Sequence, residues 1–243
     1  MASYLITGSS RGIGLEMTRQ LIESHGDITI FAAARSTTNP EFQELLRKYP
    51  TRLIHVPLDV TSGDSIRNAA SFVTGKLDGR GLDILINNAG VMNVGRIQDM
   101  DDLDETFRTN VSGVHALTRA LLPLMRKGEQ KKILNISSTL GSITMQSTNY
   151  MTTTPSYKIS KAALNMLTVI YAYELQEEDF TVFCVSPGWL KTELGGENAD
   201  LPVSTGVASV LKILSETDKK DNGHFFNIEV SGWERYDGKQ IPW

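Results

Sequence analysis

Short apolar runs without polar alternation recur along this 243-residue chain, and patterns of helical periodicity separate them. A strand that is hydrophobic on both faces must be covered on both faces, and helices between successive strands allow those strands to run parallel. The alternation therefore predicts an α/β fold, a doubly wound (Rossmann-type) parallel sheet of about seven strands with helices on both faces.

The predicted elements follow one another in regular order. Strands are expected at residues 4–7, 27–34, 52–56, 82–86, 132–136, 181–185 and 224–228. Helices are expected at residues 14–24, 40–49, 62–77, 102–126, 157–175 and 202–215, with Ser62 as an N-cap. No internal repeat and no Pro- or Ser-rich linker divides the sequence, so residues 1–243 are expected to form one domain.

Charge and composition exclude several classes of function. A net charge of −4 gives no electrostatic reason to expect nucleic acid or an anionic membrane as a partner. The single cysteine, Cys184, cannot form an internal disulfide, and it lies in an apolar run. The four histidines have no carboxylate or cysteine at ligand spacing, so no metal site is predicted. No signal or membrane-spanning pattern is present, and a cytoplasmic protein is expected.

A glycine-rich turn lies between the first predicted strand and the first predicted helix, at Thr7-Gly8-Ser9-Ser10-Arg11-Gly12-Ile13-Gly14. Glycines there permit a tight turn, let the backbone approach a pyrophosphate, and allow close packing of helix on strand. The N-terminus of the helix then offers free N–H groups to phosphate oxygens. The spacing GxxxGxG differs from the common fingerprint GxGxxG, but the strand–turn–helix context predicts a dinucleotide site.

The end of the second predicted strand indicates which dinucleotide is preferred. NAD is recognised there by an acidic residue that binds the ribose 2′-hydroxyl, yet no acidic residue lies between Asp27 and Glu41. The strand ends in Arg35, followed by Ser36, and a guanidinium pairs well with a 2′-phosphate. Arg11 is a second candidate cation. NADP(H) is therefore the predicted cofactor, and the simpler alternative is that Arg35 only solubilises a loop.

Tyr157 and Lys161 are four residues apart in the predicted helix at 157–175, so they lie one turn apart on the same face. A phenol has an ordinary pKa of about 10 and is a poor acid-base catalyst at neutral pH. An ammonium group beside it lowers that pKa, which lets the phenol exchange a proton with a carbonyl or an alcohol. Taken alone, the pair is more simply explained as two polar residues on a helix surface.

The order in which these motifs occur together is more informative than any one of them alone. TGxxxGxG, Asn87-Asn88-Ala89-Gly90, Asn110, Ser138, Tyr157-xxx-Lys161 and Pro187-Gly188 appear as they do in short-chain dehydrogenases/reductases. The chain resembles that family over nearly its whole length. Its C-terminal half is more particularly similar to the carbonyl reductases of the sniffer and C-factor kind, through residues 187–192, Gly195-Gly196 and the ending at 236–243.

For the reaction, the resemblance implies a catalytic set of Asn110, Ser138, Tyr157 and Lys161. Tyr157 would protonate the substrate carbonyl as hydride arrives from the nicotinamide, and Ser138 would hydrogen-bond the carbonyl oxygen. Lys161 would lower the Tyr157 pKa and bind the nicotinamide ribose. Asn110 would hold a water that relays protons to Lys161. In the family pattern the catalytic serine is Ser138 and not its neighbour Ser137.

The resemblance also extends the cofactor site, with Asp59 on the adenine and Ile13 beneath the pyrophosphate. Asn87 and Asn88 have a structural alternative, because both could stabilise a turn after the strand at 82–86. The cofactor-binding residues predicted in this way are Gly8, Ser10, Arg11, Gly12, Ile13, Gly14, Arg35, Ser36, Asp59, Val60, Asn87, Ala89, Gly90, Tyr157, Lys161, Pro187, Gly188, Trp189, Leu190 and Thr192.

Two segments are expected to form the substrate pocket. Ser138 and Tyr157 are nineteen positions apart, farther than is usual in the family, and sniffer-like reductases share this longer form. Residues 189–201, with Gly195 and Gly196 as hinges, are expected to fold over the substrate. The residues predicted to line the pocket are Leu140, Met145, Met151, Trp189 and Leu194.

The leading hypothesis is an NADPH-dependent ketoreductase that acts on a ketone or aldehyde of moderate apolar character, or on the corresponding alcohol. The alternatives are a cofactor-binding regulatory protein on the same fold, and a family member that acts on a natural-product intermediate. The sequence pairs no serine with a histidine, which disfavours a hydrolase. A homodimer or homotetramer is expected, paired through the helices at 102–126 and 157–175.

Overall fold

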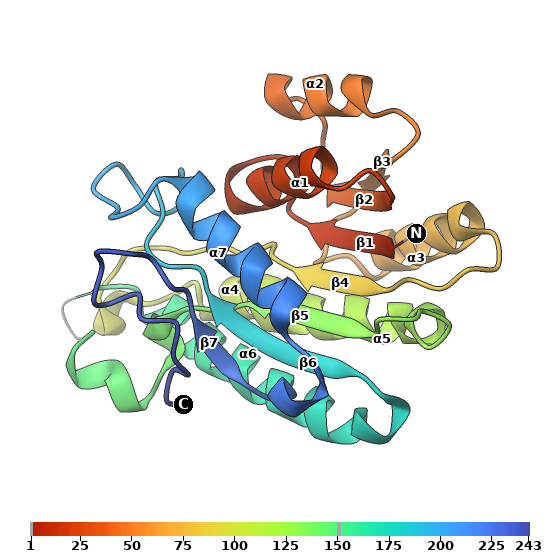
Figure 1. The fold of residues 1–243 in the computed structure, drawn as a ribbon. Coiled ribbons are helices and arrows are strands. Elements are labelled where there is room, and N and C mark those ends of the chain that lie inside the picture. Colours follow the sequence, from red (N-terminus) through yellow and green to blue (C-terminus); the bar gives the residue numbers. More distant parts are fainter. Residues whose placement is uncertain (1, 150–151) are drawn as a thin grey trace.

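The computed structural model describes residues 2–149 and 152–243, which form a seven-stranded parallel sheet covered by helices on both faces (Figure 1). The spatial order is β3-β2-β1-β4-β5-β6-β7, and it reverses direction beside β1. Ligands of open α/β sheets bind outside the carboxyl ends of the strands at such a switch point. The predicted fold class is confirmed. The strands are β1 (Ala2–Thr7), β2 (Ile28–Ala34), β3 (Leu53–Pro57), β4 (Ile84–Asn87), β5 (Lys132–Ile136), β6 (Thr181–Ser186) and β7 (Phe225–Asn227).

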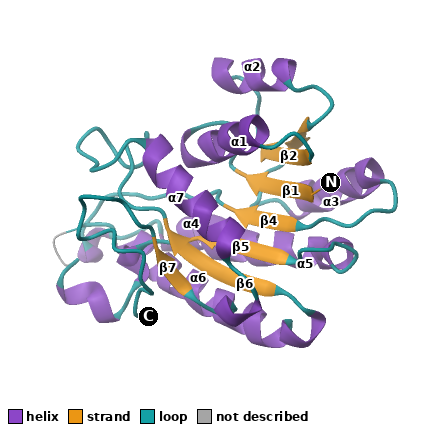
Figure 2. Cartoon of the chain, viewed as in Figure 1, coloured by secondary structure: helices purple, strands orange, loops and turns teal. Residues whose placement is uncertain are grey.

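Helices alternate with the strands along the chain (Figure 2). The predicted cap of the third helix is present, because the Ser62 side chain accepts a hydrogen bond from the Ser65 N–H.

Short 3₁₀ turns lie at Ile97–Asp99, Thr139–Gly141, Thr144–Ser147, Gln176–Glu178 and Lys219–Asp221. The α-helices are α1 (Gly12–Ser24), α2 (Pro40–Lys48), α3 (Gly63–Leu77), α4 (Leu103–Phe107), α5 (Gly113–Met125), α6 (Pro155–Glu174) and α7 (Val203–Glu216).

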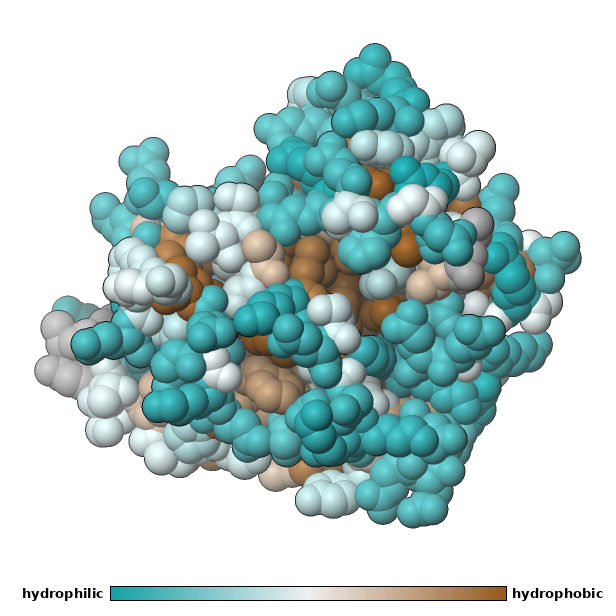
Figure 3. Space-filling model, in the orientation of Figure 1, coloured by the Kyte–Doolittle hydropathy of each residue, from teal (hydrophilic) through white to brown (hydrophobic). Residues whose placement is uncertain are grey.

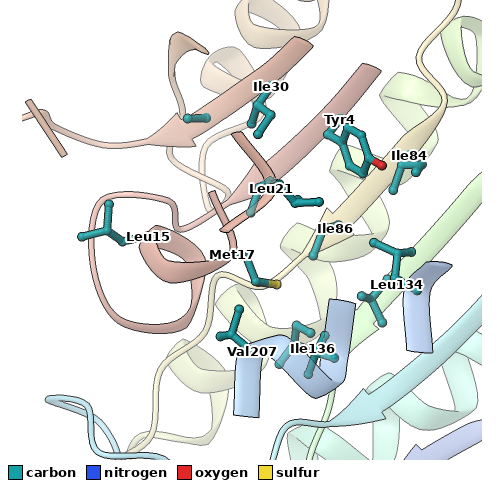
Figure 4. Packing of buried hydrophobic residues seen from close by; sticks show 14 of the residues in the cluster. Tyr4, Leu15, Met17, Leu21, Ile30, Ile84, Ile86, Leu134, Ile136 and Val207 are labelled. Carbon is teal, nitrogen blue, oxygen red and sulfur yellow. The ribbon is translucent and has the colours of Figure 1, made fainter. Parts of the chain in front are cut away.

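Successive strand residues pack into opposite layers, because side chains alternate across a sheet. In β1, Ile6 belongs to the cluster that contains Met17 of α1 and Val207 of α7 (Figure 4). Its neighbour Leu5 packs with Leu117 of α5 in the cluster on the other face. Truncating such fully buried side chains costs about 2–5 kcal/mol each. On the face seen in Figure 3, apolar residues show mainly in recesses of a hydrophilic surface.

One predicted helix is wrong in detail. Residues 102–126 do not form one continuous helix, since α4 passes into α5 through a π-helical turn at Arg108–Ser112. Such turns insert an extra residue into the helical repeat and often occur at functional sites. Here the turn contains Asn110, which is completely buried. Helical periodicity in the sequence carries no signal for a single widened turn.

Candidate active site

A cleft of about 2240 Å³ runs along the carboxyl ends of the strands. These strand ends point to the left in Figure 1. Residues that follow β1, β2, β3 and β4 line one part of it, which we call the cofactor end after its predicted role. Residues that follow β5, β6 and β7 line the other part, which we call the substrate end. Tyr157 and Lys161 of α6 also line the cleft.

The glycine-rich turn forms the floor of the cofactor end. Gly8 and Gly12 have φ of +70° and +54°, a backbone conformation that favours glycine. Gly14 packs beneath them, because a Cβ at Gly14 would lie 2.6 Å from Asn88 Nδ2 and still closer to the Gly8 carbonyl. Helix α1 then begins without a side-chain cap, which leaves its first N–H groups for a ligand. Of the predicted residues in the turn, Gly8, Ser10, Arg11, Gly12 and Ile13 line the cleft and Gly14 does not.

Asn88, and not Asn87, reaches the cleft after β4. The Asn88 side chain donates to the Thr7 carbonyl at 2.8 Å, and Thr7 Oγ1 accepts from the N–H groups of Asn88 and Ala89, both at 2.9 Å. The Asn87 amide instead donates to Thr118 and Asn135 in the interior. The Asn87 side chain therefore does not line the cleft, and the predicted place of Asn87 on the adenosine side stays a prediction. The predicted Ala89 and Gly90 line the cleft.

Arg35 and Arg11 differ in their surroundings. Both are exposed and both line the cleft, but Arg11 forms an ion pair with Glu193. Among the described residues no ion pair holds Arg35. Hydrogen bonds from Thr61 and, more weakly, the charge of Arg35 keep the pKa of the Asp59 carboxyl below its usual range, against the effect of burial. Arg35 is therefore the cation that is free to meet a phosphate. Ser36, Asp59 and Val60 line the cleft beside it.

Ser138, Tyr157 and Lys161 lie together in the middle of the cleft. The Lys161 Nζ lies 5.4 Å from the centre of the Tyr157 ring and donates to the Ile136 carbonyl at 2.7 Å. Ser138 follows β5 and hydrogen-bonds the Tyr157 hydroxyl. Its neighbour Ser137 instead donates to Asn165 at 2.5 Å within the core. The geometry thus distinguishes the two serines in favour of Ser138.

Burial shifts both titrating groups of this cluster. Desolvation raises the pKa of Tyr157 to about 12, although the hydrogen bond with Ser138 acts in the opposite direction. Desolvation also lowers the pKa of Lys161 to about 8. The prediction that Lys161 lowers the Tyr157 pKa is not met in the protein alone, because the ammonium lies over the ring and donates to a carbonyl oxygen. Tyr157 is therefore a neutral phenol, which is the form that donates a proton.

Asn110 does not line the cleft, but its side chain holds together the segments that carry the cluster. Its side chain accepts from the Val91 N–H and donates to the Val91 carbonyl, both at 2.9 Å, and it donates to Ser160 at 3.0 Å. A Cβ at Gly90 would lie 3.3 Å from Asn110 Oδ1 and 3.8 Å from Lys161 Nζ. Asn110 therefore ties the chain after β4 to α6. Its predicted role in holding a water remains a prediction.

The segment at 189–201 is a loop that is closed at its base. Lys191 N–H donates to the Leu201 carbonyl, and Leu201 N–H donates to the Trp189 carbonyl. The loop contacts the glycine-rich turn through the ion pair between Glu193 and Arg11. Gly196, with φ of +77° and open space around it, suits the predicted hinge. All of the predicted residues here line the cleft, namely Pro187, Gly188, Trp189, Leu190, Thr192 and Leu194.

Sequence reasoning assigned no role to Tyr236, which holds both ends of this loop. Its hydroxyl accepts from the Trp189 N–H at 3.1 Å and donates to Asp200, which also pairs with Arg235. Its ring packs so closely on Gly188 that a Cβ there would lie 3.1 Å away. Only the position of Tyr236 in the ending shared with sniffer-like reductases could have indicated such a role.

The segment after β5 forms one wall of the substrate end. Leu140 and Met145 line the cleft as predicted, and Met151 lies outside the described residues. Lys158 holds this wall to α6 by donating to the Gln146 side chain at 2.9 Å and to the Asn149 carbonyl at 2.7 Å. The ending at residues 240–242 also lines the cleft, and no prediction included it.

Within residues 2–149 and 152–243, no group of three or more His, Cys, Asp or Glu side chains is placed to hold a metal ion. In the same residues no helix has the length and apolarity needed to cross a membrane.

Comparison with known proteins identifies a family and several proteins that are similar to this chain in sequence and structure. The family model for short chain dehydrogenases matches residues 3–201. The NADPH-bound carbonyl reductase from chicken fatty liver superposes with a TM-score of 0.90 at 36% identity, covering 100% of this chain and 99% of that one. The carbonyl reductase Sniffer of D. melanogaster superposes with a TM-score of 0.90 at 29% identity, over 100% of both chains. The short-chain dehydrogenase anuI of Penicillium roqueforti is 32% identical over 232 residues, 89% of this chain and 90% of the relative.

Proposed function

The chain belongs to the short-chain dehydrogenase family, and we propose that it is an NADPH-dependent carbonyl reductase that converts a ketone or aldehyde to an alcohol. The observation that carries the proposal is the cluster of Ser138, Tyr157 and Lys161 in the middle of one cleft. That cleft continues to the glycine-rich turn and to Arg35. The solved relatives include an NADPH-bound carbonyl reductase.

The cofactor end fits a dinucleotide. Gly8 and Gly12 keep side chains out of the turn, and the uncapped N-terminus of α1 presents N–H groups for a pyrophosphate. When bound, a nicotinamide dinucleotide supplies or accepts the hydride. Asp59 and Val60 would lie on the adenosine side. Thr192 belongs to the loop after β6 but lies next to the glycine-rich turn, since a Cβ at Gly12 would be 3.6 Å from its Cγ2, and it would lie on the phosphate side.

Arg35 supports the choice of NADP(H) over NAD(H). It follows β2 directly, it is exposed at the cleft, and its guanidinium is not held by an ion pair within the described residues. A free guanidinium gains a charge-assisted, bidentate contact from a 2′-phosphate but little from a 2′-hydroxyl.

Tyr157 acts as the general acid in reduction. A phenol with a pKa of about 12 is protonated at neutral pH and carries the proton that the forming alkoxide needs. Ser138 stabilises the carbonyl oxygen as negative charge develops there. Lys161, held by the Ile136 carbonyl, lies beside Tyr157 in the cleft, where it would hydrogen-bond the nicotinamide ribose. In the oxidative direction the same groups run in reverse.

The proposal is tested by following NADPH oxidation with a panel of ketones and aldehydes, in wild type and in Tyr157→Phe. Wild type is expected to oxidise NADPH with at least one carbonyl, and Tyr157→Phe to lower kcat by about 10²- to 10⁴-fold. The matched control is Tyr173→Phe, which removes an exposed hydroxyl from the same helix. A wild type that binds NADPH but oxidises it with no carbonyl would favour the regulatory alternative.

We also propose that the protein is a homodimer or homotetramer that pairs through α6. This helix exposes the apolar side chains of Ile159, Met166 and Ile170, together with the ring of Tyr173. Light scattering of wild type and Met166→Glu tests this, with a smaller species expected for the variant. A monomeric wild type would contradict it.

A further inference from the structure

Lys158 ties residues 139–149, which we call the substrate wall, to helix α6. Its Nζ donates to Gln146 Oε1 at 2.9 Å and to the Asn149 carbonyl at 2.7 Å. A lysine ordinarily keeps its ammonium in water or pairs it with a carboxylate, but Lys158 is partly buried and forms no ion pair within residues 2–149 and 152–243. Burial accordingly lowers the pKa of this ammonium. A cation that exchanges water for two neutral oxygens of one segment indicates a role in holding that segment.

The bonds of Lys158 complete a ring that contains the proposed proton donor. Asn149 Nδ2 donates to the Thr139 carbonyl at 3.2 Å, and Thr139 directly follows Ser138. Elsewhere in the ring Ser138 hydrogen-bonds Tyr157, and Lys158 is the next residue of the same helix. The substrate wall is therefore held in a fixed position relative to the two hydroxyl groups that would meet a carbonyl oxygen.

The ending of the sequence holds the substrate wall at a second place. Ser142 Oγ donates to the Pro242 carbonyl at 2.5 Å. Met145, which lines the cleft, packs against the buried cluster that contains Phe225 and Ile241. A wall that is fixed at two places cannot yield to a substrate, so the size of the substituent that fits beside it is set in advance.

The two side chains that make the bond from α6 to the wall lie away from the substrate. Neither Lys158 nor Gln146 lines the cleft, whereas Met145, Thr148 and Asn149 of the same wall do. Lys158 and Gln146 can therefore influence a bound ketone only through the placement of the wall. A substitution at either position reports on that placement and not on a lost contact with substrate.

We propose that Lys158 is a positioning residue that fixes the substrate wall relative to Tyr157, so that a ketone with two unequal substituents binds preferentially in one orientation. In the reduction the carbonyl carbon gains a hydride and its oxygen gains the Tyr157 proton, while NADPH becomes NADP⁺. The two faces of such a ketone give mirror-image alcohols, so the orientation decides the product. The inference rests on the proposed reductase function and narrows its substrate class to prochiral ketones.

The test measures the ratio of the two alcohol enantiomers formed from 2-octanone, acetophenone and 2-acetonaphthone, by chiral chromatography. Both enantiomers come from the same enzyme in the same reaction, so the folded fraction and the affinity for NADPH cancel from the ratio. Lys158→Met removes the ammonium and keeps an unbranched side chain. Gln146→Leu removes the acceptor of one of the two bonds. The matched control is Lys76→Met, which changes an exposed lysine of α3.

Lys158→Met is expected to lower the enantiomeric ratio about threefold to tenfold, which is what one or two hydrogen bonds contribute. Gln146→Leu should lower it about twofold to threefold, because the bond to the Asn149 carbonyl remains. The double variant should stay within about twofold of Lys158→Met, since both substitutions break the same bond. Lys76→Met should leave the ratio as in wild type.

A merely stabilising role for Lys158 gives a different result. The melting temperature of Lys158→Met would then fall while its enantiomeric ratio stayed equal to that of wild type, and this outcome would overturn the inference. Nearly racemic alcohol from wild type, with every ketone that it reduces, would overturn it as well. In both cases NADPH is still oxidised with a ketone, so the reductase function stands.

Failure of the proposed function is seen in wild type alone. If wild type reduces other carbonyls but none of the three ketones, the narrowed substrate class is wrong and the reductase function stands. If wild type oxidises NADPH with no carbonyl at all, the proposed function is wrong, and the inference about Lys158 is wrong with it.

Discussion

The two ends of the cleft are built in different ways. The cofactor end consists largely of backbone at the ends of neighbouring strands. Its floor is one short turn between β1 and α1, in which Gly8 and Gly14 are only six residues apart. The substrate end is assembled by side chains from distant segments, as in the bonds from Ser142 to Pro242 and from Trp189 to Tyr236. We therefore expect substitutions at the cofactor end to affect binding and stability steeply, and those at the substrate end to change specificity gradually.

The largest effect is expected for Gly14→Ala. A Cβ at this position would lie 2.6 Å from Asn88 Nδ2 and closer still to the Gly8 carbonyl, so backbone must move. We expect the free energy of unfolding to fall by about 3 kcal/mol and the NADPH dissociation constant to rise about a hundredfold or more. Urea unfolding and fluorescence titration with NADPH measure the two quantities.

Gly75→Ala is the matched control for that substitution. Gly75 lies inside α3, and a Cβ there would meet nothing within 4 Å. Alanine in an exposed helix interior is expected to stabilise the protein by about 0.5–1 kcal/mol and to leave NADPH binding unchanged. Similar losses in both variants would show that the turn at Gly14 is not special, and the contrast between the two ends would weaken.

Lys161 lines the cleft between its cofactor end and its substrate end. The titration of this lysine should make the free energy of unfolding depend on pH. Burial lowers its pKa to about 8, so between about pH 8 and pH 10.5 the unfolded chain binds a proton that the folded chain does not. Stability from this group therefore rises with pH through that window. Relative to Lys161→Met, the free energy of unfolding of wild type should increase by about 2 kcal/mol from pH 7.5 to pH 10.

The comparison with Lys161→Met isolates this effect from others in the same range. Burial also raises the pKa of Tyr157 and of Cys184, and both shifts lower stability at high pH. These two groups are present in wild type and variant alike, so their contributions largely cancel in the difference. Parallel pH curves for the two proteins would mean that Lys161 is not desolvated in the way the structure indicates.

The next effect concerns the choice of cofactor. Arg35→Asp should raise the dissociation constant of NADPH about tenfold to a hundredfold, because it replaces a phosphate partner with a like charge. The dissociation constant of NADH should change about threefold or less, because NADH has no 2′-phosphate. Arg11→Ala should have a smaller effect on NADPH, since Arg11 is paired with Glu193. Equal losses of affinity for NADPH and NADH would contradict the assignment of Arg35 as the partner of the 2′-phosphate.

The same contrast explains what could be predicted from the sequence. The strands, the Ser62 cap and the glycine-rich turn were predictable because each has a signal within a few neighbouring residues. Asn87 and Asn88 were not separable, because the register of β4 between β1 and β5 decides which of them faces the cleft.

Longer-range features had no such local signal. The role of Tyr236 depends on contacts with Trp189 and Asp200, which lie far away in the sequence. The pKa of Tyr157 was predicted in the wrong direction for the protein alone, because four-residue spacing reports that Lys161 is near and says nothing of desolvation. Burial at this site depends on the packing of whole elements.

The smallest effect is expected for Tyr236→Phe, which sharpens the comparison at the substrate end. The ring keeps its packing against Gly188, but the Trp189 N–H and Asp200 lose their common partner. Asp200 still pairs with Arg235, so stability should fall by only about 1 kcal/mol. With the base of the loop loosened, the KM for the ketone should rise about threefold to tenfold, while kcat and the NADPH dissociation constant change about twofold or less. Steady-state kinetics and an NADPH titration separate these quantities. If NADPH affinity falls as much as KM rises, the loop belongs to the cofactor end, and the two ends of the cleft are not independent.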